Sequence, residues 1–175
     1  MRKLTMDELH RASVEEFKQS DKHQVAVVLD NIRSMHNVGS AFRTSDAFKI
    51  EKLVLCGITA RPPHREIHKT ALGATESVTW EHEEDTAAAV QQLKAAGYQI
   101  VVVEQTTNSV MLQDFDFTPA EKYAFVFGNE AFGVSDDVLP FADQSLEIPQ
   151  FGTKHSLNIS VSLGIVLWDY VRKVM

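Results

Sequence analysis

The chain has 175 residues, a length that predicts one domain able to bury roughly two thirds of the surface of its unfolded form. Hydrophobic residues make up 44% and charged residues 23% of it, which excludes a disordered or low-complexity chain. Cys56 is the only cysteine, the first residues lack the apolar core of a secretory signal, and no apolar run is both long and uninterrupted, so we expect a cytoplasmic protein without disulfides or membrane spans.

The net charge of −7 conceals an uneven distribution of charge along the chain. Between Arg33 and Lys69, seven Lys and Arg residues stand against three acidic residues, a balance of +4. Between Thr70 and Gln150, two basic residues stand against fourteen acidic ones, a balance of −12. A basic face on an acidic body can hold a polyanion, because the local potential matters more than the total charge. A chance cluster of solvated charges is the alternative interpretation.

Residues 1–22 are predicted to form an N-terminal helical extension, and residues 23–175 the main domain. The sequence TMDE, from Thr5 to Glu8, fits a capping box, in which each side chain accepts a hydrogen bond from the other residue's backbone amide. A short helix is therefore expected to follow to about Lys18.

Strand and helix patterns alternate through the main domain. Apolar, β-branched runs predict strands at 24–30, 52–57, a short stretch near 78, 99–104, 123–128 and 145–149. Helices are predicted over 37–48 and 83–98, with a helical turn in the polar loop after Pro62 and Pro63. This alternation predicts an α/β fold with a largely parallel sheet flanked by helices. Because such folds bind ligands at the carboxyl ends of their strands, the loops beginning at Asn31, Gln105, Gly128 and Pro149 are expected to converge on one site.

The last apolar segment, from Leu157 to Lys173, is compatible with a strand or a helix by its pattern alone. Every second residue from Leu157 to Leu167 is Leu, Ile or Val, which is the period of a strand. A strand of this length would run roughly 55 Å, whereas a globule of this size is only about 40 Å across. A helix would be roughly 25 Å long, so we predict a helix that is buried on more than one face, the second face lying in a subunit interface.

Polar strings follow several of the predicted strands. FGNEAFGVS, at 127–135, is rich in glycine directly after a strand, so that its backbone can approach a ligand closely, and Glu130 can accept from a hydroxyl or an amine. It matches neither a P-loop nor GxGxxG, and a tight strand-to-helix turn is the structural alternative.

Three strings together resemble the three motifs of the SpoU-type (TrmH-like) ribose 2′-O-methyltransferases of the SPOUT class. The first is NVGSAFRT at 37–44, the second is FGNE at 127–130 with GVS at 133–135, and the third is IP at 148–149 with Gly152 and SLNISV at 156–161. The motifs occur in the family's order over about 125 residues, which makes the match specific, and the resemblance extends from about residue 25 to the C-terminus.

The resemblance implies a SPOUT methyltransferase domain at 23–175 whose C-terminal part forms a deep trefoil knot, a topology that sequence periodicity would not suggest. It implies a homodimer that packs through the C-terminal helix, and S-adenosyl-L-methionine bound in the knotted loops. The residues implied to bind this cofactor are Gly128, Asn129, Ile148, Pro149 and Leu157, with Gln105 and Thr106 as weaker candidates.

The family's polar active-site positions correspond to Asn37, Arg43, Glu130, Ser156 and Asn158. The family assigns Arg43 to the handling of the hydroxyl proton; however, a guanidinium is a poor base. In a physically easier version Arg43 grips a phosphate and stabilises the developing alkoxide, while a phosphate oxygen or water takes the proton. Asn37 and Asn158 are expected to orient the ribose or Arg43, and Ser156 to contact a ligand, but each of the three is also a possible helix cap.

RNA is the implied substrate, with tRNA favoured and rRNA as the alternative. Candidate RNA contacts are Arg33, Arg61, Arg65 and Lys154, although Lys154 and the loop around Arg65 also suit solvated surface. His64 and His68 are four residues apart, but no third ligand is evident and we expect no metal. Two rival hypotheses are a catalytically silent RNA-binding protein and a nucleotide-binding α/β protein unrelated to methylation.

Overall fold

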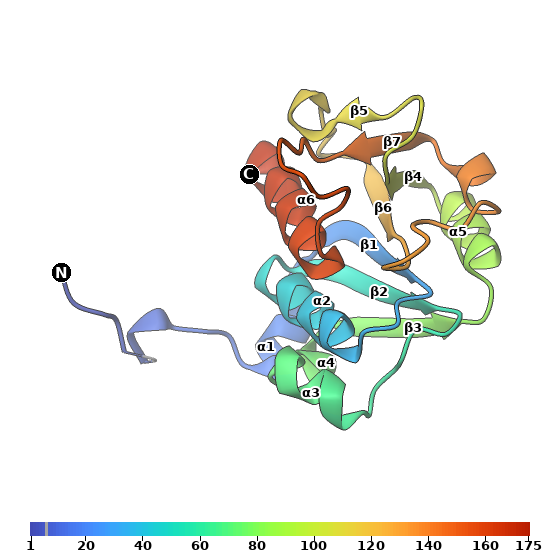
Figure 1. The fold of residues 1–175 in the computed structure, drawn as a ribbon. Coiled ribbons are helices and arrows are strands. Elements are labelled where there is room, and N and C mark those ends of the chain that lie inside the picture. The colour runs from blue at the N-terminus through green and yellow to red at the C-terminus, as the bar shows by residue number, and fades with distance from the viewer. Residues whose placement is uncertain (6) are drawn as a thin grey trace.

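The protein is described by a computed structural model that covers residues 1–5 and 7–175. In this described part, seven strands form one sheet in the order β3-β2-β1-β6-β4-β7-β5, and each neighbouring pair is parallel (Figure 1). The strands are β1 (His23–Asp30), β2 (Ile50–Cys56), β3 (Thr79–Glu83), β4 (Tyr98–Val103), β5 (Val110–Met111), β6 (Lys122–Phe127) and β7 (Gln144–Glu147). The predicted α/β fold with a parallel sheet is confirmed; the two-residue strand β5 was not predicted.

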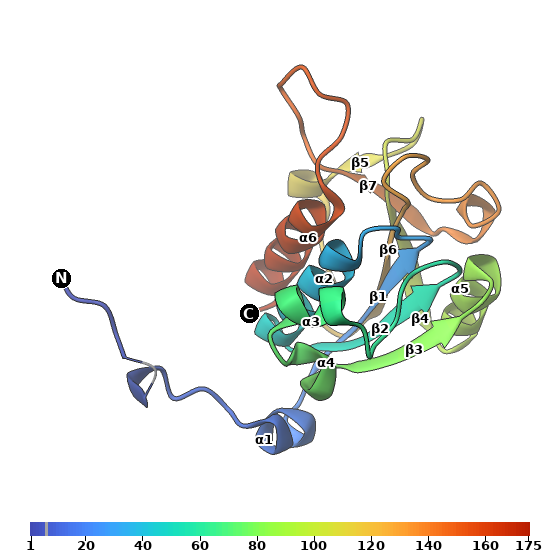
Figure 2. The same cartoon turned by 60° about the horizontal axis from the view of Figure 1, so that its bottom comes forward.

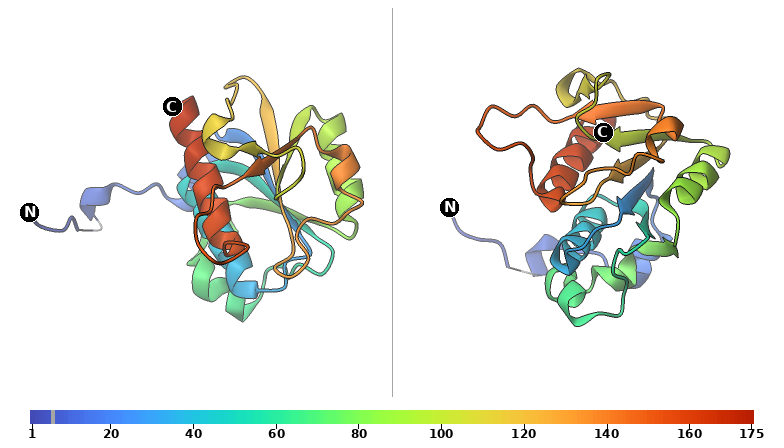
Figure 3. Two further views of the ribbon diagram at one scale, coloured as in Figure 1. Left: turned by 45° about the horizontal axis from the view of Figure 1, so that its top comes forward. Right: turned by 45° about the vertical axis from the view of Figure 1, so that its right-hand side comes forward.

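Helices cover both faces of the sheet (Figures 1 and 3). The α-helices are α1 (Val14–Gln19), α2 (Met35–Ala47), α3 (Arg65–Ala71), α4 (Ala74–Ser77), α5 (Thr86–Ala95) and α6 (Ile159–Val174), and the 3₁₀ turns are η1 (Asp7–Leu9), η2 (Leu112–Asp114) and η3 (Leu139–Phe141). Successive residues of the central strand β1 point to opposite faces. Val25, Val27 and Leu29 pack in the core that contains α2 and α6, whereas Ala26 and Val28 pack in the core that contains α5.

The register of the four central strands aligns their carboxyl ends. Leu29 of β1 pairs with Phe127 of β6, which pairs with Val103 of β4, which in turn pairs with Leu146 of β7. The loops that follow these strands therefore leave the sheet side by side. This is the convergence predicted from the alternating pattern.

The C-terminal segment is a helix, as its length predicted, and it begins at Ile159 rather than at Leu157. Asn158 caps it: its Oδ1 accepts from the backbone amide of Ser160 at 2.9 Å. One face of α6 packs in the core beside α2, and the other leaves Val161, Ile165 and Trp168 exposed. No helix in residues 1–5 and 7–175 is long and apolar enough to cross a bilayer.

The helix predicted from Thr5 to about Lys18 is wrong in its extent. The capping box does form, because Glu8 accepts from the Thr5 amide at 2.8 Å and Thr5 accepts from the Glu8 amide at 3.4 Å. It caps only the single turn η1, which ends at Leu9, and the next residue, His10, has a φ of 46° that is incompatible with a continued helix. A second capping box, between Ser13 and Glu16, starts α1. Ahead of α1, residues 7–12 extend away from the body (Figure 2).

Candidate functional site

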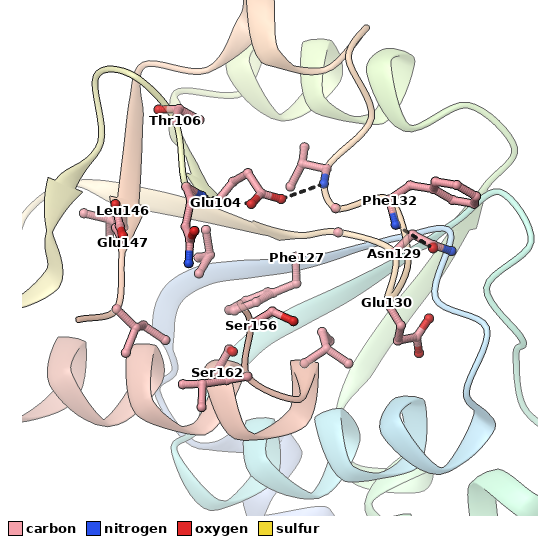
Figure 4. Close-up of a pocket in the computed structure, with 18 of the residues that line it drawn as sticks. Glu104, Thr106, Phe127, Asn129, Glu130, Phe132, Leu146, Glu147, Ser156 and Ser162 are labelled. Carbon is pink, nitrogen blue, oxygen red and sulfur yellow. Dashed lines mark hydrogen bonds between the residues drawn. The ribbon is translucent and has the colours of Figure 1, made fainter. Parts of the chain in front are cut away.

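A pocket of about 790 Å³ opens at the aligned carboxyl ends of the central strands (Figure 4). Its volume lies in the range of small-molecule sites, about 300–1,000 Å³. The lining comes from the ends of β4, β6 and β7, from the turn after β6, and from the start of α6 with the residues just before it. Residues from two of the three sequence motifs, the second and the third, therefore line one cavity.

The turn after β6 is held closed by its own backbone. Asn129 and Gly133 exchange two backbone hydrogen bonds, each of 2.9 Å, and Gly133 has a φ of +72° that favours glycine. A Cβ on Gly128 would lie 2.1 Å from the backbone of Gly133, so only glycine permits this close approach. The glycines thus shape a tight turn, the alternative raised from sequence, and the same turn lines the pocket.

Glu130 connects the second motif to the first. Its carboxylate accepts from the backbone amides of Arg33 and Ser34 at 3.0 and 3.1 Å and from Nδ2 of Asn37 at 3.0 Å. Partial burial raises the pKa of Glu130, but the hydrogen bonds from Arg33, Asn37 and Ser34 act together in the opposite direction and bring the pKa below its ordinary value of 4.5. Its negative charge also lies at the N-terminus of α2, where the helix dipole favours an anion.

The side chain of Asn129 makes a second connection to the first motif's loop. Its Nδ2 donates to the backbone oxygen of Asn31 at 2.6 Å, and its Oδ1 accepts from the amides of Ala131 and Phe132 at 2.9 and 3.3 Å. The loop after β1 and the turn after β6 therefore form one hydrogen-bonded unit, although they lie about 100 residues apart in the sequence.

Two further carboxylates hold this unit, and sequence reasoning missed both. Asp30, fully buried at the end of β1, accepts from the hydroxyl of Thr86 at 2.6 Å and from the amide of Ser135 at 2.7 Å. Glu104, just beyond β4, accepts from the amides of Gln105 and Val134 at 2.9 and 3.1 Å and lines the pocket. An acidic residue that closes an apolar strand needs buried donors, and this signal could have identified both.

The third motif lies in a loop that makes few contacts with the body. Residues 151–158 are all exposed, and the loop stands away from the sheet in Figure 2. In the described chain, one hydrogen bond joins residues 151–158 to the loop after β4, from Nε2 of Gln105 to the backbone oxygen of His155, at 3.1 Å. Ser156 is not a helix cap, whereas Asn158 is, so the capping alternative holds for Asn158.

Most residues implied by the resemblance are brought together here. The pocket is lined by Gln105, Thr106, Gly128, Asn129, Glu130, Ile148, Ser156, Leu157 and Asn158. Asn37 lies inside α2 rather than at its cap, which is Ser34, and it reaches the pocket only through Glu130. Pro149 is not among the lining residues.

Arg43 and the proposed RNA contacts lie outside the pocket of a single chain. Arg43 is exposed on α2, six residues and therefore about 9 Å along the helix axis from Asn37. Arg33, Arg61, Arg65 and Lys154 are also exposed. His64 caps α3, its Nδ1 accepting from the amide of Glu66 at 3.2 Å, and no group of three potential metal ligands occurs in the part of the chain that the structure describes.

The pocket suits S-adenosylmethionine in size and charge. Four carboxylate residues line it, and its described lining contains no Lys, Arg or His; the acidic residues are Glu104, Glu130, Asp136 and Glu147. A sulfonium cation is favoured in such a field. Strand ends and turns around Gly128, Ile148 and Leu157 supply backbone groups and apolar surface, the combination typical of cofactor sites.

Comparisons with known proteins agree with this site. The model of the SpoU rRNA Methylase family matches residues 24–168. A tRNA (guanosine(18)-2′-O)-methyltransferase of Aquifex aeolicus is 32% identical over 162 residues, which cover 90% of this chain and 74% of that protein.

Two solved structures extend the comparison to the fold. The crystal structure of the A. aeolicus TrmH/SpoU tRNA modifying enzyme superposes with a TM-score of 0.81 at 28% identity, over 91% of this chain and 80% of that one. The S-adenosylmethionine-bound rRNA methyltransferase from Sinorhizobium meliloti has a TM-score of 0.80 at 26% identity, over 94% of this chain and 62% of that one. The family model matches most of the chain, the fold is shared with solved structures of the family, and two of the three motifs line the pocket. The chain therefore belongs to the SpoU family of S-adenosylmethionine-dependent RNA 2′-O-methyltransferases.

Proposed function

We propose that this protein methylates a ribose 2′-hydroxyl of a tRNA, with rRNA as the second candidate. The observation that supports the site of this reaction is the Glu130 carboxylate, which joins the first motif to the pocket lined by the other two. The tRNA preference is supported by the relative that acts on tRNA, since it shares 32% identity and most of its length with this chain. The rRNA methyltransferase from S. meliloti is a longer protein of which the chain spans 62%.

The residues around the pocket have distinct roles in this proposal. S-adenosylmethionine supplies an activated methyl group when bound. Gly128, Ile148 and Leu157 hold the adenosine portion through backbone groups and apolar surface, assisted by Asn129, Pro149, Gln105 and Thr106. Glu130 fixes Asn37 and the N-terminus of α2. Ser156 and Asn158 contact the RNA ribose that is methylated. Such positioning is what the reaction demands, because the donor is already activated.

Arg43 is proposed to grip a phosphate of the RNA and to stabilise the developing alkoxide. A guanidinium offers a planar fork of donors that matches a phosphate, and it remains protonated, which suits electrostatic stabilisation better than proton removal. Its exposed position on α2 leaves it free to meet RNA. Arg33, Arg61, Arg65 and Lys154 would extend this basic surface along the substrate.

A homodimer through α6 is also proposed, together with the C-terminal trefoil knot and the division into residues 1–22 and 23–175. Val161, Ile165 and Trp168 follow a helical spacing on the outer face of α6 and are 49%, 36% and 51% exposed in the single chain. A partner helix would cover this apolar stripe. Sedimentation analysis of Trp168→Glu tests the assembly: a monomeric variant supports it, and an unchanged dimer contradicts it.

Transfer of labelled methyl groups to tRNA from cells that lack the protein tests the reaction. We expect Arg43→Ala to lower kcat/KM by at least about 100-fold, the scale of losing one transition-state contact. Lys49→Ala is the matched control, because Lys49 is an exposed cation just beyond the C-terminal end of α2. Cofactor binding without transfer to any RNA would support the silent RNA-binding protein, and no cofactor affinity would support the unrelated nucleotide-binding protein.

The substrate is tested by mapping ribose methylation across total RNA in cells with and without the protein. A single tRNA position that loses its methyl group supports the proposal. Loss confined to rRNA would replace tRNA by rRNA as the substrate.

A further inference from the structure

Phe132 is a large aromatic side chain that the fold leaves almost completely uncovered. It is 87% exposed, although it lines the pocket and lies only two residues from Glu130. In Figure 4 the ring projects from the turn after β6 at the Glu130 end of the cavity and points away from its centre. Two residues span at most about 7 Å of chain, so the Cα atoms of Phe132 and Glu130 lie within this distance of each other.

The backbone that carries Phe132 is fixed before any ligand binds. The Phe132 amide donates to Oδ1 of Asn129, and the next residue, Gly133, exchanges backbone hydrogen bonds with Asn129. Phe151, on the opposite side of the pocket, is 97% exposed but belongs to the sparsely bonded loop after β7. Phe132 is therefore an exposed aromatic residue on a hydrogen-bonded turn. Its backbone loses little conformational entropy when a partner covers the ring.

The charges around Phe132 indicate which partner covers it. The pocket lining has four carboxylate residues and, among the described residues, no cation, so a phosphate group would be repelled there. A nucleobase is neutral and has a flat face that stacks on aromatic side chains, the usual mode by which proteins hold unpaired RNA bases.

We propose that Phe132 stacks on an unpaired base of the RNA substrate beside the methylated ribose. This inference rests on the proposed RNA methylation and names a residue that positions the substrate for it. The phosphates of the same RNA strand then lie toward Arg43 and the other exposed basic residues, while the base lies against the acidic pocket lining. Stacking on a π-face tolerates any base, so Phe132 contributes affinity and orientation rather than base identity.

The test combines RNA binding with kinetics for Phe132→Ala, Phe132→Leu and Phe132→Trp. The probe is tRNA from cells that lack the protein, bound in the presence of S-adenosylhomocysteine so that no turnover occurs. We expect Phe132→Ala to weaken RNA binding and to raise KM for RNA by about 5- to 150-fold, the range that corresponds to loss of one stacked base. Phe132→Leu should remain weak and Phe132→Trp should bind at least as well as the wild type. Cofactor affinity, measured by calorimetry, should stay within about twofold.

Leu72→Ala is the matched control, because Leu72 is 65% exposed and lies at the end of α3, outside the pocket lining. Wild-type RNA affinity in Phe132→Ala or in Phe132→Leu overturns the stacking contact. A change in oligomeric state in Phe132→Ala also overturns it, because the ring would then contact a second copy of the chain. Failure of the wild type to methylate any RNA overturns the proposed function instead, and the binding measurements still decide whether Phe132 holds a base.

Discussion

The two sides of the pocket differ in how completely they are built. On the side of β1 and β6, Glu130 and Asn129 bind the loop after β1 and the first turn of α2 through four hydrogen bonds of 2.6–3.1 Å. On the side of β7 and α6, residues 151–158 are exposed, and in the described chain one hydrogen bond, from Gln105 to His155, joins them to the loop after β4. Each side contributes one of the motifs that line the pocket.

This difference indicates a division of labour. The first side is preorganised, so its polar groups are positioned before the ligand arrives and cost little to align. Residues 151–158 of the second side have few hydrogen-bond partners, as expected of a segment that orders on binding. We therefore expect substitutions on the first side to lower both the stability and the activity of the protein. On the second side, we expect residues 151–158 to become more ordered when the cofactor binds.

The largest effect is expected from Glu130→Ala. The substitution leaves three donors of α2 and its preceding loop without their acceptor, at a cost of about 1–2 kcal/mol. For a domain of this size, Tm should fall by roughly 2–8 °C, and kcat/KM should fall by at least about 100-fold because Asn37 loses its position. Calorimetry and methyl transfer measure the two effects.

Two control variants define that comparison. Asp137→Ala removes an exposed carboxylate that, like Glu130, lies between β6 and β7, but outside the pocket lining. It should change neither Tm nor kcat/KM. Ser156→Ala, on the loop side, should lower activity while leaving Tm within about 1 °C. Equal losses of stability in Ser156→Ala and Glu130→Ala would contradict the proposed difference in preorganisation between the two sides.

The second effect concerns hydrogen exchange when S-adenosylmethionine binds. Amides in residues 150–158 should exchange more slowly, by up to about 100-fold at a ligand concentration of 100 Kd, because binding stabilises the ordered loop. Amides of the Asn129–Gly133 turn, which are already hydrogen-bonded to each other, should change much less. Peptide-level exchange by mass spectrometry measures both segments, and similar protection in the two would contradict the distinction.

The first side of the pocket also shows how far sequence reasoning reaches. Strand patterns, glycines and polar residues at strand ends placed the four loops at one edge of the sheet, because these are local or periodic signals. The contact between Glu130 and Asn37 joins residues 93 positions apart and depends on the order of strands in the sheet, which no local pattern specifies. The resemblance supplied Glu130 as a site residue, and the structure supplied its partners.

The extension and β5 show where local signals fail. Thr5 and Glu8 form the predicted capping box, yet the turn they cap ends at Leu9, since a cap nucleates a helix without supplying the tertiary contacts that maintain one. Strand β5 is two residues long and exists only through its pairing with β7. The exposure of Phe132 is likewise a tertiary property, which no local pattern in the sequence specifies.

The smallest effect is the pH dependence contributed by Glu130. Its pKa lies below the ordinary 4.5 in the folded protein, so the folded state favours the carboxylate. The stabilisation is then fully present above the unfolded pKa and is lost as the pH falls through the lower, folded value. Glu130→Gln has no such charge to lose. The difference in Tm between the wild type and Glu130→Gln should therefore be constant from pH 7 down to about 5 and should shrink as the pH falls below 4.5. Thermal unfolding at stepped pH measures it, and a difference that grows on acidification would mean that burial, rather than the donors of α2, controls this carboxylate.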